Sequence, residues 1–399
     1  MQDDIKTQNQ NTPVSSPPES QENFTPLPKP TQAPNLSTDT SGKVSISAPK
    51  KKGLKSLTKK QKIILLVIAA VLLIGGGVGA FLLLKPEAKQ ALLPAAKEPT
   101  PPPKTTEASK LTGLEVGLDV NKKPIIAVMI ENSPDARPQS GLKDAGIVYE
   151  AVAEGGITRF SALFLDNAPD YLGPVRSVRP YYLDFVTPFA APLAHVGGSP
   201  DGLAQMRAQN LRDLDQFSNS GAYWRESSRY APHNMYSSIP KLLDVAKSKG
   251  YDAVPITSFA RKAKEEPATE NLIKTISLTI SSALYNVVYR YDSTTNTYLR
   301  ELAGQKHVDA KSGIQLAPKV VVALVMTQGA NGKYTTYQTN GQGKMFVFQD
   351  GKQITGTWQK TDRTSQFVFK DDQGNELKLN PGQTWISIVG SASAVTATP

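Results

Sequence analysis

The sequence contains no cysteine, which excludes disulfide scaffolds, cysteine nucleophiles, thiolate metal sites and membrane attachment through a lipidated cysteine. It has only three histidines, His195, His233 and His307, and none belongs to a recognised metal-ligand spacing. It also has no phosphate-binding glycine loop and no dinucleotide-binding fingerprint. We therefore predict neither a metal site nor a cofactor.

Long apolar runs are absent except for one, at residues 63–84, which contains no charge and no proline. About 20 apolar residues suffice for a helix to cross a bilayer core, so this run predicts a transmembrane helix held by the lipid bilayer. Only Lys85 and Lys89 follow the run closely. A lysine cluster precedes it, formed by Lys50, Lys51, Lys52, Lys55, Lys59, Lys60 and Lys62. The positive-inside rule then places the amino terminus in the cytoplasm and the residues after 84 outside the plasma membrane.

The same lysine cluster accounts for much of the net charge of +10, so we predict no nucleic-acid partner. Gly75 and Gly79 have the spacing at which spanning helices pair, which predicts a weak homodimer as one alternative. Residues 1–49 are rich in Pro, Ser, Thr, Gln and Asn and predict a disordered cytoplasmic tail. A basic juxtamembrane segment follows at 50–62, and a proline-rich linker at 85–110.

From about residue 111 the pattern predicts a layered, mixed α/β domain over 111–262. Apolar runs of strand length lie at 125–132, 146–151, 157–165 and 193–196. Helical patterns lie at 180–185, 203–210 and 239–249, with Ser177, Ser199 and Ser238 as the expected caps.

Residues 263–390 alternate as strands do and predict a β-rich second domain, followed by a flexible tail at 391–399. The predicted strands are 276–280, 287–291, 297–301, 320–326, 344–348, 355–359, 366–370, 376–379 and 384–389. The expected fold class is therefore α+β, with an α/β domain and a β-rich domain tethered by one transmembrane helix.

The motif HVGGSPDG joins the end of a strand, at His195, to the start of a helix. Ser199 suits the N-cap position, and the free amides there are able to accept an anion. A capped turn without a ligand explains the motif equally well. A nucleophilic serine is disfavoured, because Asp201 stands where the G-x-S-x-G pattern needs glycine.

A second polar stretch, YWRESSRYAPHNMY, combines an indole, guanidinium groups and an imidazole in a segment too polar for a core. Such groups suit sugars and phosphates, although a surface loop held by its aromatic residues is the alternative. Its candidate ligand-binding residues are Trp224, Arg225, Arg229, His233 and Asn234.

Arg176 and Arg179 lie at a predicted helix start, where a cation opposes the helix dipole. They are therefore either partners of buried acids or receptors for an anion. The nearby acids are Glu131, which ends the first strand, and Glu150 and Glu154 around the end of the second.

The motifs IAVMIENSPDARPQSGL, AVAEGGITRF, GPVRSVRPYY, HVGGSPDG and WRESSRYAPHNMY resemble those of the YerB-like bacterial family. The later GQGKMFVFQDGKQITGTWQK and LNPGQTWISIV are similar to its carboxy-terminal domain. The resemblance covers about residues 112–390. It implies an exported, membrane-attached or lipidated protein with an α/β domain and a β-rich domain, and it implies no particular activity.

These features lead to three functional hypotheses. The first is an envelope protein that binds an anionic or sugar-containing ligand, such as a cell-wall polymer, through the residues Arg176, Arg179, His195, Ser199, Trp224, Arg225, Arg229, His233 and Asn234. The second is an envelope hydrolase whose acid or base is His233, Glu154 or His195. The third is an assembly factor that binds another envelope protein.

Overall fold

The computed structural model describes residues 58–60, 63–64, 67 and 104–399. The predicted tail at 1–49, the Gly75–Gly79 pair and most of the 63–84 run lie outside these residues. Residues 59–60, 63–64 and 67 are helical. Within the described part of the chain, no helix combines the length and the apolar character needed to cross a membrane.

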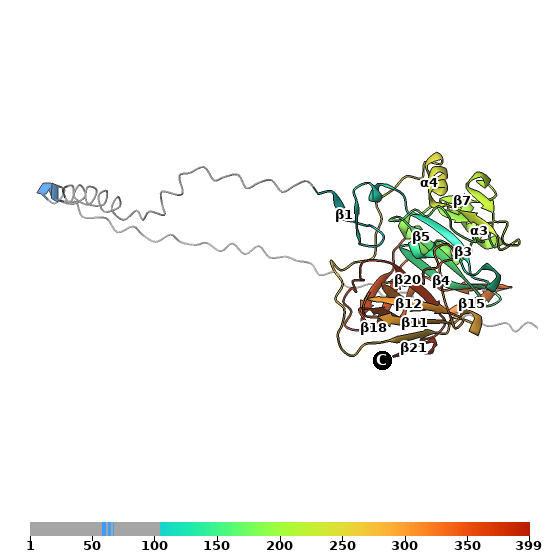
Figure 1. The fold of residues 1–399 in the computed structure, drawn as a ribbon. Helices are drawn as coiled ribbons and strands as arrows, with labels where there is room; N and C mark the ends of the chain where they lie inside the picture. Colours follow the sequence, from blue (N-terminus) through green and yellow to red (C-terminus); the bar gives the residue numbers. More distant parts are fainter. Residues whose placement is uncertain (1–57, 61–62, 65–66, 68–103) are drawn as a thin grey trace, which may run out of the picture. The chain divides into compact units, whose positions relative to one another are not determined.

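One large sheet contains strands from both halves of the chain (Figure 1). The first half supplies β3 (Ile126–Glu131), β4 (Ile147–Glu154), β5 (Ile157–Phe164), β6 (Leu193–His195) and β7 (Asp213–Asp215). The second half supplies β14 (Val320–Val325), β15 (Gln328–Asn331), β16 (Tyr334–Tyr337), β17 (Gly341–Gln349), β18 (Lys352–Lys360), β19 (Val368–Asp371) and β20 (Thr384–Val389). The main path runs β19-β18-β17-β14-β20-β4-β5-β3-β6-β7. Because β20 pairs in parallel with both β14 and β4, the regions predicted as separate domains share one sheet.

Both faces of this sheet are covered, as the unbroken apolar runs predict. Along β3, Ile126, Val128 and Ile130 enter one core cluster, while Ala127 and Met129 enter the other. Side chains alternate across a strand, so a run buried on both faces has to be apolar at every position. The prediction of a doubly buried strand at 125–132 is confirmed.

Three α-helices cover the sheet within residues 104–399, namely α2 (Pro180–Val186), α3 (Pro200–Ala208) and α4 (Ile239–Ser248). Tyr182 and Phe185 of α2 belong to one core cluster, and Leu242 of α4 belongs to the other. The cap predicted at Ser177 is wrong, because α2 begins after Arg179, whose side chain makes no capping bond.

A second sheet has the order β13-β12-β11-β10-β21. Its strands are β10 (Thr275–Leu278), β11 (Val287–Asp292), β12 (Thr297–Leu302), β13 (Gln305–Lys306) and β21 (Val395–Thr398). The prediction of a flexible tail at 391–399 is wrong, because β21 pairs antiparallel with β10. Ile276 and Tyr289 of this sheet share a core cluster with Trp385 of the large sheet.

Three short segments, at the end of the linker, at 376–379 and between β17 and β18, also test the sequence predictions. The end of the predicted linker is folded, because β1 (Thr106–Ala108) pairs with β2 (Glu115–Gly117). The predicted strand at 376–379 makes only isolated bridges. The hairpin between β17 and β18 turns at Asp350 and Gly351, both with positive φ, as Asp-Gly turns do.

Candidate functional site

The candidate site is built on a short hairpin of β8 (Tyr223–Arg225) and β9 (Met235–Ser237). Between these strands Asn234 fixes the connecting loop, since its amide donates to the carbonyl oxygens of Glu226 at 3.2 Å and Arg229 at 3.1 Å. The Oδ1 atom of Asn234 accepts from Arg225 Nη1 at 2.7 Å. Asn234 and Arg225 therefore hold the loop in shape.

This loop docks on the segment that follows β3. Arg229 donates from Nη1 to the carbonyl oxygen of Asp135 at 3.0 Å and from Nη2 to that of Pro138 at 2.7 Å. A hollow of about 350 Å³ lies between the two segments. It is lined by Asp135, Ser228, Arg229, Tyr230 and His233.

His233 is held by a buried carboxylate at the end of β3. Its Nδ1 atom lies 2.9 Å from Oε1 of Glu131, whose side chain is only 4% exposed. The hydroxyl of Ser133 donates to the same Oε1 at 2.9 Å and lies 3.2 Å from Nδ1. We assign the proton to Nδ1 from this network. In the neutral imidazole Nε2 is then an acceptor.

Arg176 completes this cluster from the segment between β5 and α2. Its Nε lies 3.1 Å from Glu131 Oε2, and its backbone amide donates to the carbonyl oxygen of Met129. Of the two roles predicted for Arg176, the structure shows the partner of a buried acid. The guanidinium balances the charge of the carboxylate that orients His233.

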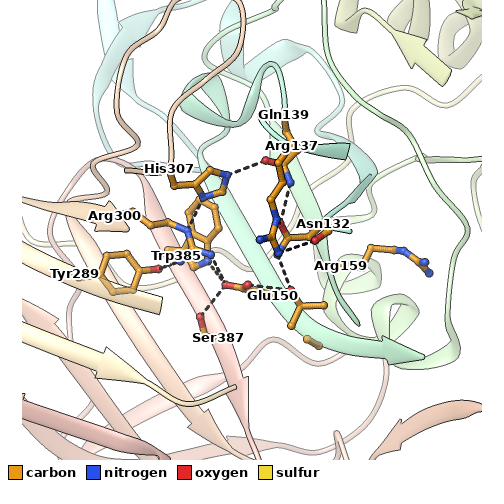
Figure 2. Close-up of polar contacts among 12 residues, drawn as sticks. Asn132, Arg137, Gln139, Glu150, Arg159, Tyr289, Arg300, His307, Trp385 and Ser387 are labelled. Atoms are coloured by element: carbon orange, nitrogen blue, oxygen red, sulfur yellow. Dashed lines mark hydrogen bonds and ion pairs between the residues drawn. The ribbon is translucent and has the colours of Figure 1, made fainter. Parts of the chain in front are cut away.

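Behind the cluster, a fully buried polar network supports the end of β3 (Figure 2). Gln139 donates from Nε2 to the Glu131 carbonyl oxygen and to Asn132 Oδ1, each at 2.9 Å. Its Oε1 accepts from His307 Nε2 at 2.8 Å. Nδ1 of His307 in turn accepts from Arg300 Nε at 3.0 Å. A chain of hydrogen bonds thus connects the second half of the protein to the strand that carries Glu131.

The centre of this network is an ion pair between the two halves. Arg300 Nη2 lies 2.9 Å from Glu150 Oε2, and neither side chain is exposed. Trp385 donates from Nε1 to the same carboxylate, and its ring lies 4.2 Å from the guanidinium. Burial, reinforced by the charge of Arg300, holds the pKa of His307 well below its ordinary value.

His195 lies elsewhere, on β6 beside the edge strand β7 of the large sheet, and is fully buried. Its Nδ1 lies 2.8 Å from the carbonyl oxygen of Gly197, and its Nε2 lies 3.1 Å from Asp213 Oδ1. Burial alone would raise the pKa of Asp213, but the hydrogen bond and charge of His195 lower it below its usual value. Both ring nitrogens of His195 are engaged within the fold.

Ser199 is the N-cap of α3, since its Oγ accepts from the amide of Gly202 at 3.3 Å. The structure thus shows the capping role that the sequence offered as one alternative. No anion-binding role is needed to explain the motif.

Arg179 and Glu154 form a separate, largely buried cluster. Nη2 of Arg179 lies 2.7 Å from Glu154 Oε2, and Nη2 of Arg159 lies 2.9 Å from Oε1. Burial would raise the pKa of Glu154, but the two arginines hold it below its usual value. The ring of Tyr334 covers the guanidinium of Arg179 at 4.9 Å. Glu154 is therefore an ionised partner of two cations and lies outside the hollow's lining.

Trp224 belongs to an aromatic group beside the hairpin. Its ring lies 5.8 Å from that of Tyr171, which lies 4.7 Å from Tyr236. The Tyr171 hydroxyl donates to Glu226 Oε2 at 2.5 Å, and Lys311 Nζ lies 4.6 Å from its ring. Trp224 thus supports the base of the loop.

The sequence therefore predicts the loop between β8 and β9 correctly, but it predicts only part of the site. Arg225, Arg229, His233 and Asn234 do come together, and Arg176 reaches His233 through Glu131. Ser133, Asp135 and Gln139 were missed, although the sequence placed Glu131 at the end of the first strand, directly before them. Within the described residues, no three His, Asp or Glu side chains lie close enough together to hold a metal ion.

Two family models match the chain. The "Protein of unknown function (DUF3048) N-terminal domain" matches residues 111–252, and the "Protein of unknown function (DUF3048) C-terminal domain" matches residues 276–386. The chain belongs to this family. It is 31% identical over 292 residues to the "Putative lipoprotein YerB" of Bacillus subtilis (strain 168). The aligned region covers 72% of this chain and 87% of that protein.

A crystal structure of YerB from Bacillus subtilis has the same fold. It superposes with a TM-score of 0.66 at 28% identity and covers 73% of this chain and all of that one. The resemblance to YerB-like proteins noted in the sequence is thereby confirmed. The matched regions include both β3, which carries Glu131, and the loop that carries His233.

Proposed function

We propose that this chain is a membrane-attached, extracytoplasmic protein that binds a hydroxylated, anionic envelope polymer in the hollow beside His233. The observation that carries the proposal is the combination of groups lining this hollow. A cation, an exposed aromatic ring and a histidine held in one tautomer surround a space of about 350 Å³.

Each of these groups has capacity left for a ligand. The donors of Arg229 reach only neutral carbonyl oxygens, and no carboxylate within residues 104–399 forms an ion pair with it. Tyr230 is 91% exposed, so its ring offers a face on which a sugar can stack. Asp135 is 80% exposed and lies 3.9 Å from His233 Nε2, where both can bond to hydroxyl groups.

The envelope location rests on two independent features. The apolar run at 63–84 and the lysines before it favour a single membrane span with residues 104–399 outside. The Bacillus subtilis relative bears the name "Putative lipoprotein YerB", which favours the same side of the membrane by another anchor. With no cysteine, this chain needs the span in place of a lipid. Phosphate-containing wall polymers are the anionic, hydroxylated molecules found there.

The test is a binding measurement with the full-length chain in lipid nanodiscs. Poly(glycerol phosphate) and purified wall fragments are titrated against the wild type and the variants Arg229→Gln and Tyr230→Ala. We expect each variant to weaken binding about 5- to 30-fold, the usual cost of a lost charged or stacking contact. Arg290→Gln is the matched control, because Arg290 is an exposed arginine paired with Glu301 on the second sheet. Unchanged affinity in both site variants would contradict the proposal.

The hydrogen bond from His233 to Glu131 favours a second candidate function, a hydrolase that uses His233 as its base. A buried carboxylate on Nδ1 and an accepting Nε2 facing a hollow are the arrangement that general-base catalysis requires. In such a reaction Nε2 takes a proton from water, the hydroxide attacks an ester, and the imidazolium returns the proton to the leaving oxygen. Of the three predicted acid or base candidates, this hypothesis uses His233, which Glu131 orients, and it gives no role to Glu154 or His195.

Turnover separates this candidate from binding alone. Wall fragments and synthetic phosphate and acyl esters are incubated with the wild type, His233→Gln and Glu131→Gln. Hydrolysis that both variants abolish, while polymer binding survives in Glu131→Gln, supports catalysis. Binding without hydrolysis of any of these substrates would leave the binding function alone.

A further inference from the structure

An apolar pocket opens beside α2. Its volume is about 190 Å³. It lies between α2, α3 and β6 and is lined by Leu183, Val186, Thr187, Ala190, Ala191, Leu193, Met206, Asn210, Leu211 and Arg212. None of these residues lines the hollow beside His233.

The size and lining of this pocket favour an apolar occupant. An engineered protein cavity of about 150 Å³ with an aliphatic and aromatic lining stays dry and binds benzene. The pocket here is larger, and most of its lining side chains are aliphatic. Water inside it finds few hydrogen-bond partners, so a hydrocarbon chain gains free energy by displacing that water.

The mouth of the pocket carries an unneutralised cation. Arg212 donates from Nη1 to the carbonyl oxygens of Ala190 at 3.1 Å and Asp252 at 2.8 Å, and its guanidinium lies 5.8 Å from the Tyr251 ring. All of these partners are neutral, and no carboxylate within residues 104–399 forms an ion pair with Arg212. An adjoining small hollow shares Ala190 and Arg212 with the pocket and is also lined by Lys110 and by Lys123, which is paired with Asp119.

We propose that this pocket binds the hydrocarbon end of an anionic amphiphile, with a carboxylate or phosphate head at Arg212. An apolar interior and a cationic rim together match that one chemical class, because a neutral hydrocarbon would leave the guanidinium unused. Such molecules occur in every membrane, either as free fatty acids or as phosphate-headed lipids. The proposal goes beyond polymer binding at His233 and does not depend on it.

The test uses the full-length chain in nanodiscs of zwitterionic lipid and three photoactivatable probes of equal chain length. One probe is a fatty acid, one is an alkyl phosphate and one is an alcohol. After irradiation, labelled peptides are identified by mass spectrometry. We expect an anionic probe to label residues 183–212 at least fivefold more than the alcohol does, and unlabelled fatty acid or alkyl phosphate to compete.

Two variants make this result specific. Arg212→Gln is expected to reduce anionic labelling to the level of the alcohol, whereas Arg207→Gln, an exposed arginine on α3, is expected to leave it unchanged. Labelling by only one anionic probe supports the proposal and identifies the source of the ligand. Equal labelling by all three probes, labelling outside 183–212, or no effect of Arg212→Gln would overturn it.

Discussion

Arg300 Nη2 lies 2.9 Å from Glu150 Oε2, and this ion pair joins the two halves of the protein with both side chains fully buried. Glu150 also accepts from Trp385, and Arg300 donates to His307 and Tyr289. Burying a charge costs free energy that its ion-pair and hydrogen-bond partners offset, so losing a partner destabilises the folded protein. Removal of either side chain of the pair is therefore expected to cost much stability.

Arg300→Met should destabilise the fold by about 3–5 kcal/mol, because it leaves the Glu150 carboxylate buried without a cation. Urea unfolding followed by tryptophan fluorescence measures this loss. The double variant Arg300→Met/Glu150→Gln should recover part of it, since neither charge of the pair remains buried without its partner. A loss below about 1 kcal/mol, the usual value of an exposed pair, would contradict this account.

His307 predicts a specific pH dependence of stability. Its pKa in the folded protein is well below the ordinary value of about 6.5, because it is buried and faces Arg300, with Arg137 nearby. Between these two pKa values the unfolded chain binds more protons, so stability falls as pH decreases below about 6.5. The slope approaches about 1.4 kcal/mol per pH unit for one group.

The variant His307→Gln removes this titration while an amide can still donate toward Gln139. The difference in unfolding free energy between wild type and variant should therefore change steadily from pH 6.5 to 5. His195 and His233 are present in both proteins and cancel from the comparison. A difference independent of pH would show that His307 does not have a lowered pKa.

Lys360 predicts a second pH effect, at the alkaline end. It is 2% exposed and donates to the carbonyl oxygens of Arg363 and Ser365, and burial lowers its pKa to about 8. Between pH 8 and its ordinary value of about 10.5, the unfolded chain binds more protons, so Lys360 makes stability rise with pH.

Lys360→Met should abolish that contribution, which is measured as the pH dependence of the difference in unfolding free energy between pH 7.5 and 10. The comparison with wild type cancels the tyrosines, which ionise near the upper end of this range. A difference that stays constant over the range would contradict the lowered pKa.

Much of the fold follows from local pattern. The strand at 125–132 is predictable because burial on both faces requires an apolar residue at every position, and Ser199 and Ser238 are predictable as caps because helix starts need acceptors for free amides. By contrast, the parallel insertion of β20 between β14 and β4 joins residues far apart in the chain. No local pattern encodes such a pairing.

The site is predictable to a similar extent. The loop residues Arg225, Arg229 and Asn234 are identified because they are polar neighbours in sequence. The bond between Glu131 and His233 joins residues 102 positions apart, and only the folded sheet brings them together. His195 and Arg179 have equally suggestive sequence contexts, yet their partners inside the fold satisfy them.

The most direct test of the central claim is to locate the bound polymer on the protein. Hydrogen–deuterium exchange of the full-length chain in nanodiscs is measured with and without saturating poly(glycerol phosphate). Binding in the hollow beside His233 predicts slower exchange in residues 133–138 and 226–234 and no change around α3. Unchanged exchange in both segments, or protection confined to another surface, would contradict it.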